Sequence, residues 1–382
     1  MAGRKKGKYK RNRFCSTVIK VVGIGGAGCS AVTRMMKAKL SGIELLALNT
    51  DAQALSHTSA HRKLRIGKNL TRGLGSGMNP EIGQKAAEES RKEIAELLRG
   101  ADIVFLTCGE GGGTGTGAAP IIADIVRDLG ILSVAVVTKP FLFEGATRMA
   151  IAEKGIQELT PLVDTIITIP NERLLYVIDK TTPLLEAFII ADEVLKQAVA
   201  GISEIITTPG LINVDFADIK TILQGAGTAL MGIGQAEGEG RALQAAKAAI
   251  ENPLLDLSIK GAKGILLSIT GSNNLTLSEV HEAAKYITES TDAQAKIIFG
   301  AVIDEKMGER IKLTVIATGF EAKELPPQPR EIKIVKPNEP ELSNQPPSEV
   351  AVKEKKNKAK KDAPQLSEDE LDIPAFIRKK MI

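Results

Sequence analysis

Residues 111–117 read Gly-Gly-Gly-Thr-Gly-Thr-Gly, and they come shortly after the apolar run Asp-Ile-Val-Phe-Leu-Thr-Cys of residues 102–108. A second glycine turn, Gly-Ile-Gly-Gly-Ala-Gly at residues 23–28, follows another apolar run at residues 17–22. Glycine lets the backbone approach an anion, and a helix N-terminus presents free N–H groups, so each turn is a candidate phosphate site. Two such turns in one domain favour a nucleotide that carries several phosphates.

The first turn taken alone predicts a different class of protein. It satisfies the Gly-x-Gly-x-x-Gly pattern, and Asp51 follows the next apolar run at residues 44–48, as in an NAD-dependent Rossmann oxidoreductase. The second turn argues against that alternative, because a dinucleotide needs only one such turn. The sequence also lacks the Gly-x-x-x-x-Gly-Lys-Ser/Thr motif, which disfavours a P-loop NTPase.

Four stretches then carry a resemblance to a known family. They are residues 109–120, Asn-Thr-Asp-Ala-Gln-Ala-Leu at residues 49–55, Pro-Phe-Leu-Phe-Glu-Gly at residues 140–145, and Asn-Val-Asp-Phe-Ala-Asp at residues 213–218. From about residue 18 to residue 320 the chain resembles FtsZ, the bacterial cell-division GTPase of the tubulin/FtsZ superfamily. The resemblance implies a GTPase that uses Mg²⁺, polymerises head to tail, hydrolyses GTP at the subunit interface and forms the division ring.

The pattern of the chain predicts an α/β fold. Short apolar runs alternate with amphipathic helical patterns up to residue 206, which is typical of a mostly parallel sheet covered by helices on both faces. Strands are expected at residues 229–234, 264–270, 296–303 and 312–317, with helices near residues 240–250 and 277–288. The predicted parts are a basic disordered arm (1–16), a GTP-binding domain with a long central helix (17–206), a smaller GTPase-activating α/β domain with a mixed sheet (207–320), a disordered linker (321–370) and a tail peptide (371–382).

The resemblance assigns a nucleotide site. The residues expected to contact the phosphates, sugar or base are Gly25, Gly26, Ala27, Gly28, Cys29, Ser30, Gly112, Gly113, Thr114, Gly115, Glu144, Arg148, Phe188 and Asp192. An aromatic ring with a carboxylate one helical turn later can stack on a purine and accept hydrogen bonds from guanine N1–H and N2–H₂, which adenine does not offer. The pair Phe188 and Asp192 therefore favours GTP over ATP.

Two carboxylates are the predicted catalytic residues. Asp215 and Asp218 begin a helical pattern beyond the central helix, so they are expected at the opposite end of the molecule from the glycine turns. A purely structural role, with Asp215 as N-cap, is the alternative. The resemblance implies that both act in trans on the nucleotide of the next subunit. Their presence disfavours a third class, a filament that binds GTP without hydrolysing it.

The sequence departs from the family at some positions. Ser30 stands where Asn is usual, preceded by Cys29, and Glu110 replaces the apolar residue that commonly precedes the triple glycine. A carboxylate beside phosphates would be repelled unless it points away or meets a cation, and the sequence does not decide between these. His57 and His61 are four residues apart in a segment expected to be a loop, and no metal site is predicted.

Composition and charge indicate the setting. The net charge is +4, and the arm at residues 4–13 carries seven basic side chains, which fits a solubilising tail better than a membrane or RNA contact. Three cysteines without metal spacing indicate a reducing compartment. No signal peptide or membrane span is expected, so the protein is predicted to be cytoplasmic, at the mid-cell division ring. Its predicted partners are other copies of itself and membrane-anchor or regulatory division proteins. Contact with the membrane is expected to be only indirect, and no contact with nucleic acid is expected.

Overall fold

The computed structural model describes residues 17–320 except residues 41, 177–180, 209, 213, 252–258 and 293. The basic arm, the linker and the tail peptide lie outside the described residues, so their predicted character stays a prediction. The described residues belong to one compact unit. The domain boundary placed after residue 206 also stays a prediction.

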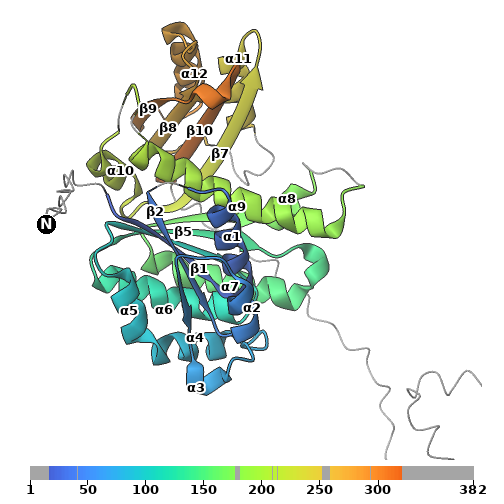
Figure 1. Cartoon of the computed structure of the whole chain (residues 1–382). Helices are drawn as coiled ribbons and strands as arrows, with labels where there is room; N and C mark the ends of the chain where they lie inside the picture. Colours follow the sequence, from blue (N-terminus) through green and yellow to red (C-terminus); the bar gives the residue numbers. More distant parts are fainter. Residues whose placement is uncertain are drawn as a thin grey trace, which may run out of the picture. The chain divides into compact units, whose positions relative to one another are not determined.

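The described strands form one sheet in the order β3-β2-β1-β4-β5-β6-β7-β10-β8-β9 (Figure 1). Their bounds are β1 (Ile19–Ile24), β2 (Ile43–Asn49), β3 (Arg62–Arg65), β4 (Ile103–Gly109), β5 (Leu132–Lys139), β6 (Thr165–Pro170), β7 (Gly227–Glu237), β8 (Gly264–Gly271), β9 (Lys296–Ile303) and β10 (Arg310–Thr318). Strands β1 to β6 are parallel to one another, so their carboxyl ends meet along one edge.

Helices cover both faces of the parallel strands. One core packs α4, α5 and α6 on the sheet, and a second packs α1, α9 and α10 on the opposite face. Buried strands such as β1 and β4 are nearly continuous runs of apolar residues, because both of their faces are covered. The helices of this part are α1 (Gly25–Lys37), α2 (Ala52–His57), α3 (Lys68–Thr71), α4 (Pro80–Glu89), α5 (Arg91–Leu98), α6 (Thr114–Asp128), α7 (Ala146–Leu159), α8 (Asn171–Leu174) and α9 (Leu184–Thr207).

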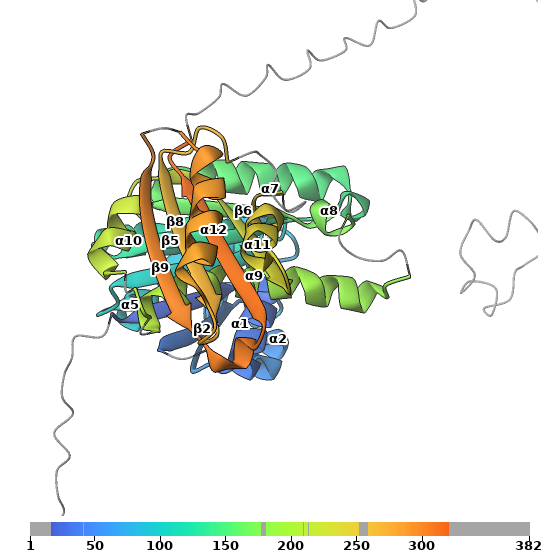
Figure 2. The same cartoon turned by 90° about the horizontal axis from the view of Figure 1, so that it is seen from above.

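The second half of the sheet is mixed, as predicted. β7 pairs antiparallel with β10, β10 pairs antiparallel with β8, and β8 is parallel to β9. After α10 (Phe216–Leu223), the helices α11 (Arg241–Ile250) and α12 (Leu277–Glu289) lie side by side over these strands (Figure 2). The four strands and two helices expected from the pattern are therefore confirmed.

The two halves meet at a short seam. β6 and β7 are parallel over only three residue pairs, from Thr165 with Gly227 to Ile167 with Ala229. Further contacts are apolar and ionic: Leu266 of β8 and Ile316 of β10 belong to the same buried cluster as the α9 side chains, and Lys312 of β10 pairs with Glu204 of α9 at 3.1 Å. At 24 residues and about 1.5 Å per residue, α9 is about 36 Å long.

The expectation of a loop around the two histidines was wrong for His57 and is confirmed for His61, which lies between α2 and β3. His57 is the last residue of α2, a helix whose start is capped by Asp51, which accepts a hydrogen bond from the Ala54 N–H at 2.9 Å. His61 directly precedes β3, and its Nδ1 accepts from the Leu45 N–H at 2.8 Å. The Asp51 carboxylate is thus a helix cap. The sequence did not reveal this role, because α2 is too short to show a clear apolar pattern. None of the described helices combines the length and the apolar character that crossing a membrane requires.

Candidate functional site

Both glycine turns lie at the carboxyl ends of neighbouring strands. β1 and β4 pair in parallel, with Gly23 beside Thr107 and Ile24 beside Cys108, and each strand leads directly into its turn. α1 and α6 then begin within the turns, so two helix N-termini face the same edge. In open α/β sheets this edge is where ligands bind.

In the first turn some glycines pack closely against their neighbours and others are exposed. A Cβ on Gly23 would lie 2.6 Å from Val32 Cγ2, and one on Gly28 would lie 2.8 Å from the Gly23 carbonyl carbon, so both positions let α1 pack on the sheet. Gly25 has φ of +69°, which glycine adopts without strain. Gly26 faces open space and is exposed, as is Ala27. The free surface of this turn is therefore its centre.

Cys29 and Ser30, which follow the turn, point in different directions. The Cys29 side chain is buried beside Ala47 and Leu55, and burial raises the pKa of its thiol to about 11. Its side chain therefore contributes to the core, and only its backbone can reach the edge. Ser30 is exposed on α1.

The second turn shows the same division. A Cβ on Gly113 would lie 2.7 Å from Asn79 N, and one on Gly115 would lie 2.9 Å from Gly109 O, so these glycines admit close backbone neighbours. Gly112 has no neighbouring atom in the direction of a Cβ. A ligand can thus approach the backbone most closely at Gly112.

The Thr114 hydroxyl belongs to a buried cluster. Its Oγ1 lies 2.7 Å from Thr50 Oγ1 and 2.9 Å from Ser76 Oγ, and all three side chains are buried. Thr50 follows β2, and Ser76 lies in the segment before α4, so three separate segments meet at the start of α6. Sequence reasoning missed Thr50 and Ser76, because nothing in the local pattern links them to Thr114.

Glu110 points away from the edge. Its side chain is buried, and its Oε1 accepts a hydrogen bond from Cys108 Sγ at 3.1 Å. Burial raises the pKa of this carboxyl. Of the two possibilities that the sequence left open, the described geometry therefore selects the inward orientation.

Glu144 and Arg148 form the expected pair. Arg148 Nη1 lies 2.8 Å from Glu144 Oε2, and Glu144 Oε1 accepts from the Phe141 N–H at 2.9 Å. These bonds fix the carboxylate in the segment between β5 and α7. Arg148 Nε is buried without a hydrogen-bond partner among the described residues, so this guanidinium retains an unused donor.

Phe188 lies in an aromatic cluster on α9. It packs edge-on against Phe141 with ring centroids 5.7 Å apart, and Phe141 stacks on Phe143 at 5.0 Å. Phe188 remains 39% exposed, so part of its ring is free for another flat group.

Asp192 already has a partner within the chain. Its Oδ2 accepts from Arg34 Nε at 2.9 Å, and Arg34 comes from α1, 158 residues away in sequence. Burial raises the pKa of Asp192, and Arg34 opposes this shift. Sequence reasoning did not identify Arg34, because its pairing depends on how α1 packs against α9.

Asn171 is a further residue that sequence reasoning missed. It follows β6, whose Pro170 pairs with Lys139 at the end of β5, so it lies on the same carboxyl edge. Its side chain is buried, and its Oδ1 has no hydrogen-bond partner among the described residues. An unsatisfied buried amide oxygen at such an edge indicates a missing donor. A polar residue directly after a predicted strand was the available signal.

Asp215 and Asp218 lie at the other end of α9. Figure 1 shows α9 running from the side of α8 to α10, which these residues begin. From Phe188 to Thr207 the helix spans about 28 Å. Asp215 is the N-cap of α10, but its side chain makes no capping hydrogen bond, and both carboxylates are exposed. One chain therefore does not bring them to the glycine turns.

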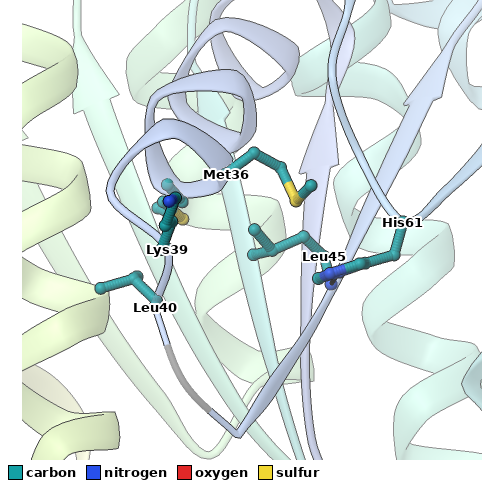
Figure 3. Close-up of a pocket in the computed structure, with 6 residues that line it drawn as sticks. Met36, Lys39, Leu40, Leu45 and His61 are labelled. Atoms are coloured by element: carbon teal, nitrogen blue, oxygen red, sulfur yellow. Dashed lines mark hydrogen bonds between the residues drawn. The ribbon is translucent and has the colours of Figure 1, made fainter.

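The structure also contains a hollow away from this edge. It has a volume of about 270 Å³ and is lined by Met35, Met36, Lys39, Leu40, Leu45 and His61 (Figure 3). It lies at the start of β2, whereas the glycine turns lie at the strand ends. The described residues hold no cluster of three or more His, Cys, Asp or Glu side chains suited to a metal.

Comparison with known proteins agrees with this geometry. Residues 18–179 match the Tubulin/FtsZ family, GTPase domain, and residues 227–321 match the FtsZ family, C-terminal domain. The chain is 47% identical to an FtsZ from M. jannaschii solved as an empty dimer, over 80% of this chain and 88% of that one, with a TM-score of 0.76. A mutant of the M. jannaschii FtsZ is 46% identical over 80% and 92% of the two chains, with a TM-score of 0.77.

A more distant likeness shows the fold alone. CetZ2 from Haloferax volcanii, solved as a protofilament bound to GTPγS, is 20% identical over 81% of this chain and 95% of that one, with a TM-score of 0.69. The two family matches cover both halves of the described chain, and the FtsZ structures span them together. The resemblance found in the motifs is thereby confirmed. The first turn is therefore explained by a tubulin/FtsZ GTPase domain and not by a dinucleotide-binding oxidoreductase. The chain belongs to the tubulin/FtsZ family.

Proposed function

We propose that this protein is a GTP-dependent, filament-forming protein of cell division that hydrolyses GTP between subunits. Its membership of the tubulin/FtsZ family supports GTP binding and self-association. The single observation that carries the proposal is the placement of two glycine turns and two helix N-termini on adjacent strands, because one such turn suffices for a pyrophosphate and two suit a longer chain of phosphates.

The proposed nucleotide lies along the carboxyl edge. Its phosphates contact the backbone at Gly26 and Gly112, where no side chain or neighbouring atom obstructs the approach. The sugar lies toward Glu144 and Arg148, and the base stacks on the exposed part of Phe188. Asp192 then accepts hydrogen bonds from the guanine edge.

Two further residues fit this arrangement. The buried Asn171 Oδ1 gains a donor from the nucleoside, which satisfies an atom that is otherwise unpaired. Arg34 holds Asp192 by one oxygen and leaves the other free to accept from the base.

Mg²⁺ fits the site as an ion carried mainly by phosphate oxygens, since Mg²⁺ in nucleotide sites keeps several waters and few protein ligands. When bound, it offsets the negative charge of the phosphates. The residues of the chain position the nucleotide independently of the ion, through the backbone of the two turns.

Hydrolysis is proposed to need a second subunit. Asp215 and Asp218 are exposed on α10, at the far end of α9 from their own glycine turns. In a head-to-tail contact they reach the nucleotide of the neighbour, where a carboxylate can orient or deprotonate the attacking water. A head-to-tail contact that does not close produces a filament.

The proposed setting is the cytoplasmic division ring at mid-cell. Residues 371–382 include Asp-Ile-Pro-Ala-Phe-Ile-Arg, in which apolar residues flank a single proline and three basic residues, 378–380, follow. This segment is proposed to bind membrane-anchor and regulatory division proteins, so that contact with the membrane is indirect.

Sedimentation of the purified protein with GTP, with GDP and without nucleotide tests the proposal. GTP is expected to yield a pellet that disappears as phosphate is released, and GTP rather than NAD is expected to raise the melting temperature. A pellet that persists with no phosphate release would instead support a filament that retains GTP. Failure of guanine nucleotide to stabilise the fold would contradict the proposed site.

A further inference from the structure

Glu110 lies directly behind the second glycine turn, and the function proposed above gives it no role. It follows β4 and precedes Gly111, and it is only 2% exposed. Its backbone N–H donates to Thr138 O at 2.9 Å, which ties the residue to β5. The carboxyl group is therefore held inside the protein, and its residue stands two positions before the candidate phosphate contact Gly112.

The carboxyl group is poorly solvated by the protein. Oε1 accepts one weak hydrogen bond, from Cys108 Sγ at 3.1 Å. Oε2 is buried and makes no hydrogen bond with any described residue, and it lies against Gly155 of α7, where a Cβ would come within 2.6 Å of it. The Thr116 hydroxyl accepts from Gly111 N at 2.9 Å, which leaves its own proton to donate, and its interaction with the carboxyl group lowers the pKa of Glu110. Burial raises the pKa of this carboxyl group, and the hydrogen bonds of Cys108 and Thr116 oppose the rise, so its ionisation is sensitive to a further charge nearby.

No cation of the described neighbouring elements forms an ion pair with the Glu110 carboxylate. Glu158 of α7 adds negative charge, which raises the pKa of Glu110 beyond the effect of burial, the larger cause. The Arg148 guanidinium pairs with Glu144, and no ion pair joins Glu110 to another described residue. The first turn of α6 carries no acidic residue. The charged or titratable groups of the elements around the carboxyl group are Cys108 of β4, Lys139 of β5, Asp124, Arg127 and Asp128 of α6, and Arg148, Glu153, Lys154 and Glu158 of α7.

We propose that Glu110 takes up one proton when a nucleoside polyphosphate binds at the second glycine turn. The proposal rests on the proposed function, in which Gly112 and the start of α6 hold the phosphates. Thr116 joins the two places, because its side chain lies beside the carboxyl and accepts from the N–H of Gly111. The phosphates repel an ionised Glu110 across this short path, and a proton from solvent on the carboxyl group removes the repulsion.

The sign of the effect follows from linkage. Binding of a polyanion raises the pKa of Glu110 above its value in the free protein. The affinity for nucleotide is therefore highest below the free-state pKa and falls as pH rises from that value to the bound-state pKa. A fully linked proton changes the dissociation constant by about tenfold per pH unit in that interval.

Calorimetric titration with GTP and Mg²⁺, in pairs of buffers that differ in ionisation enthalpy, counts the protons taken up. The proteins are wild type, Glu110→Gln, Glu110→Met and the matched control Glu153→Gln, an exposed carboxylate of α7. The terminal phosphate itself titrates near pH 6, but this contribution is common to all four. We expect greater proton uptake by wild type and Glu153→Gln than by either Glu110 variant, and tighter GTP binding by both Glu110 variants at alkaline pH.

The outcomes separate a failure of this inference from a failure of the proposed function. Equal proton uptake by wild type and by the Glu110 variants would overturn the inference while leaving the proposed function intact. Absence of GTP binding by wild type would instead remove the proposed function. Should both variants fail to fold, infrared difference spectra of the wild-type protein decide: GTP is expected to add the absorbance of a protonated carboxyl group, and no such gain overturns the inference.

Discussion

The candidate residues at the two ends of α9 differ in whether their side chains have partners within the chain. At the glycine end the polar side chains are already engaged within the chain: Asp192 with Arg34, and Glu144 with Arg148. At the α10 end Asp215 and Asp218 are exposed, and no ion pair or side-chain hydrogen bond joins either carboxylate to another described residue. The candidate ligand contacts at the first end are therefore held by partners within the chain, whereas the carboxylates at the second end are not.

This difference separates binding from chemistry. Preorganised pairs hold a ligand in one orientation at little further cost in entropy. Exposed carboxylates at a distance of about 28 Å along a rigid helix do not serve their own site. The comparison therefore predicts that substitutions at the glycine end change affinity, and that substitutions at the α10 end change turnover.

The largest expected effect is at the α10 end. Asp218→Ala and Asp215→Ala are expected to lower GTP turnover by at least about 100-fold, because a carboxylate that orients or deprotonates water contributes on that scale. GTP affinity of the isolated subunit is expected to stay unchanged. Phosphate release and equilibrium binding of a fluorescent GTP analogue measure the two quantities, with Glu282→Ala, an exposed carboxylate on α12, as control.

Mixing sharpens this test. A subunit with Asp218→Ala retains a competent glycine end, and a subunit with Gly112→Ala retains competent carboxylates. The mixture is expected to recover turnover that neither variant has alone. Loss of GTP binding by a monomer with either Asp substitution would show that these residues serve their own site, and would break the comparison.

The second effect compares two adjacent glycines. Gly112→Ala is expected to weaken GTP binding by about 10- to 100-fold, since the new methyl group occupies open space where phosphate approaches. Gly113→Ala is expected to lower the melting temperature as well, because its Cβ would meet Asn79 within the protein. Thermal unfolding beside a binding titration separates them, and equal loss of stability in both would contradict the assignment of Gly112 to the ligand surface.

A third, smaller effect concerns the base. Asp192→Ala is expected to weaken GTP binding by about tenfold and to leave ATP binding unchanged, since adenine lacks the N1–H and N2–H₂ donors that guanine offers to this carboxylate. Competition between GTP and ATP measures the ratio, and Glu193→Ala, its neighbour on α9, is the control. An equal loss for both nucleotides would mean that Asp192 acts through Arg34 and the packing of α1.

The smallest effect is expected from the tail. Deletion of residues 371–382 is expected to change neither GTP affinity nor turnover by more than about twofold, because the two ends of α9 are complete without it. Recruitment of an adaptor protein is expected to be lost. Competition of the free peptide with the full-length protein in a pull-down checks this, and unchanged recruitment after deletion would leave these residues without the proposed role.

The sequence predicted what local patterns determine. Apolar runs, helical periodicity and glycine turns located the strands and helices of the α/β fold, including the four strands of the mixed half. The i,i+4 pair Glu144 and Arg148 was also visible, since both residues lie within one turn.

What the sequence did not reveal depends on contacts between distant segments. The partner of Asp192 is 158 residues away, and the Thr50 and Thr114 hydroxyls are 64 residues apart. Gly26 and Gly28 of the first turn were both predicted as ligand contacts, yet Gly28 faces the protein while Gly26 faces outward. Spacing along the chain carries no information on which side of a turn is crowded.

The three-pair seam between β6 and β7 has a mechanical consequence. Hydrogen bonds resist displacement along a defined direction, whereas apolar contacts are non-directional and re-form after a small slip. Besides these three pairs, the joint holds the apolar cluster around Leu266 and Ile316 and the ion pair of Lys312 with Glu204 at 3.1 Å. Few directional bonds would therefore oppose a small displacement of one half of the sheet against the other, along the 24-residue helix α9.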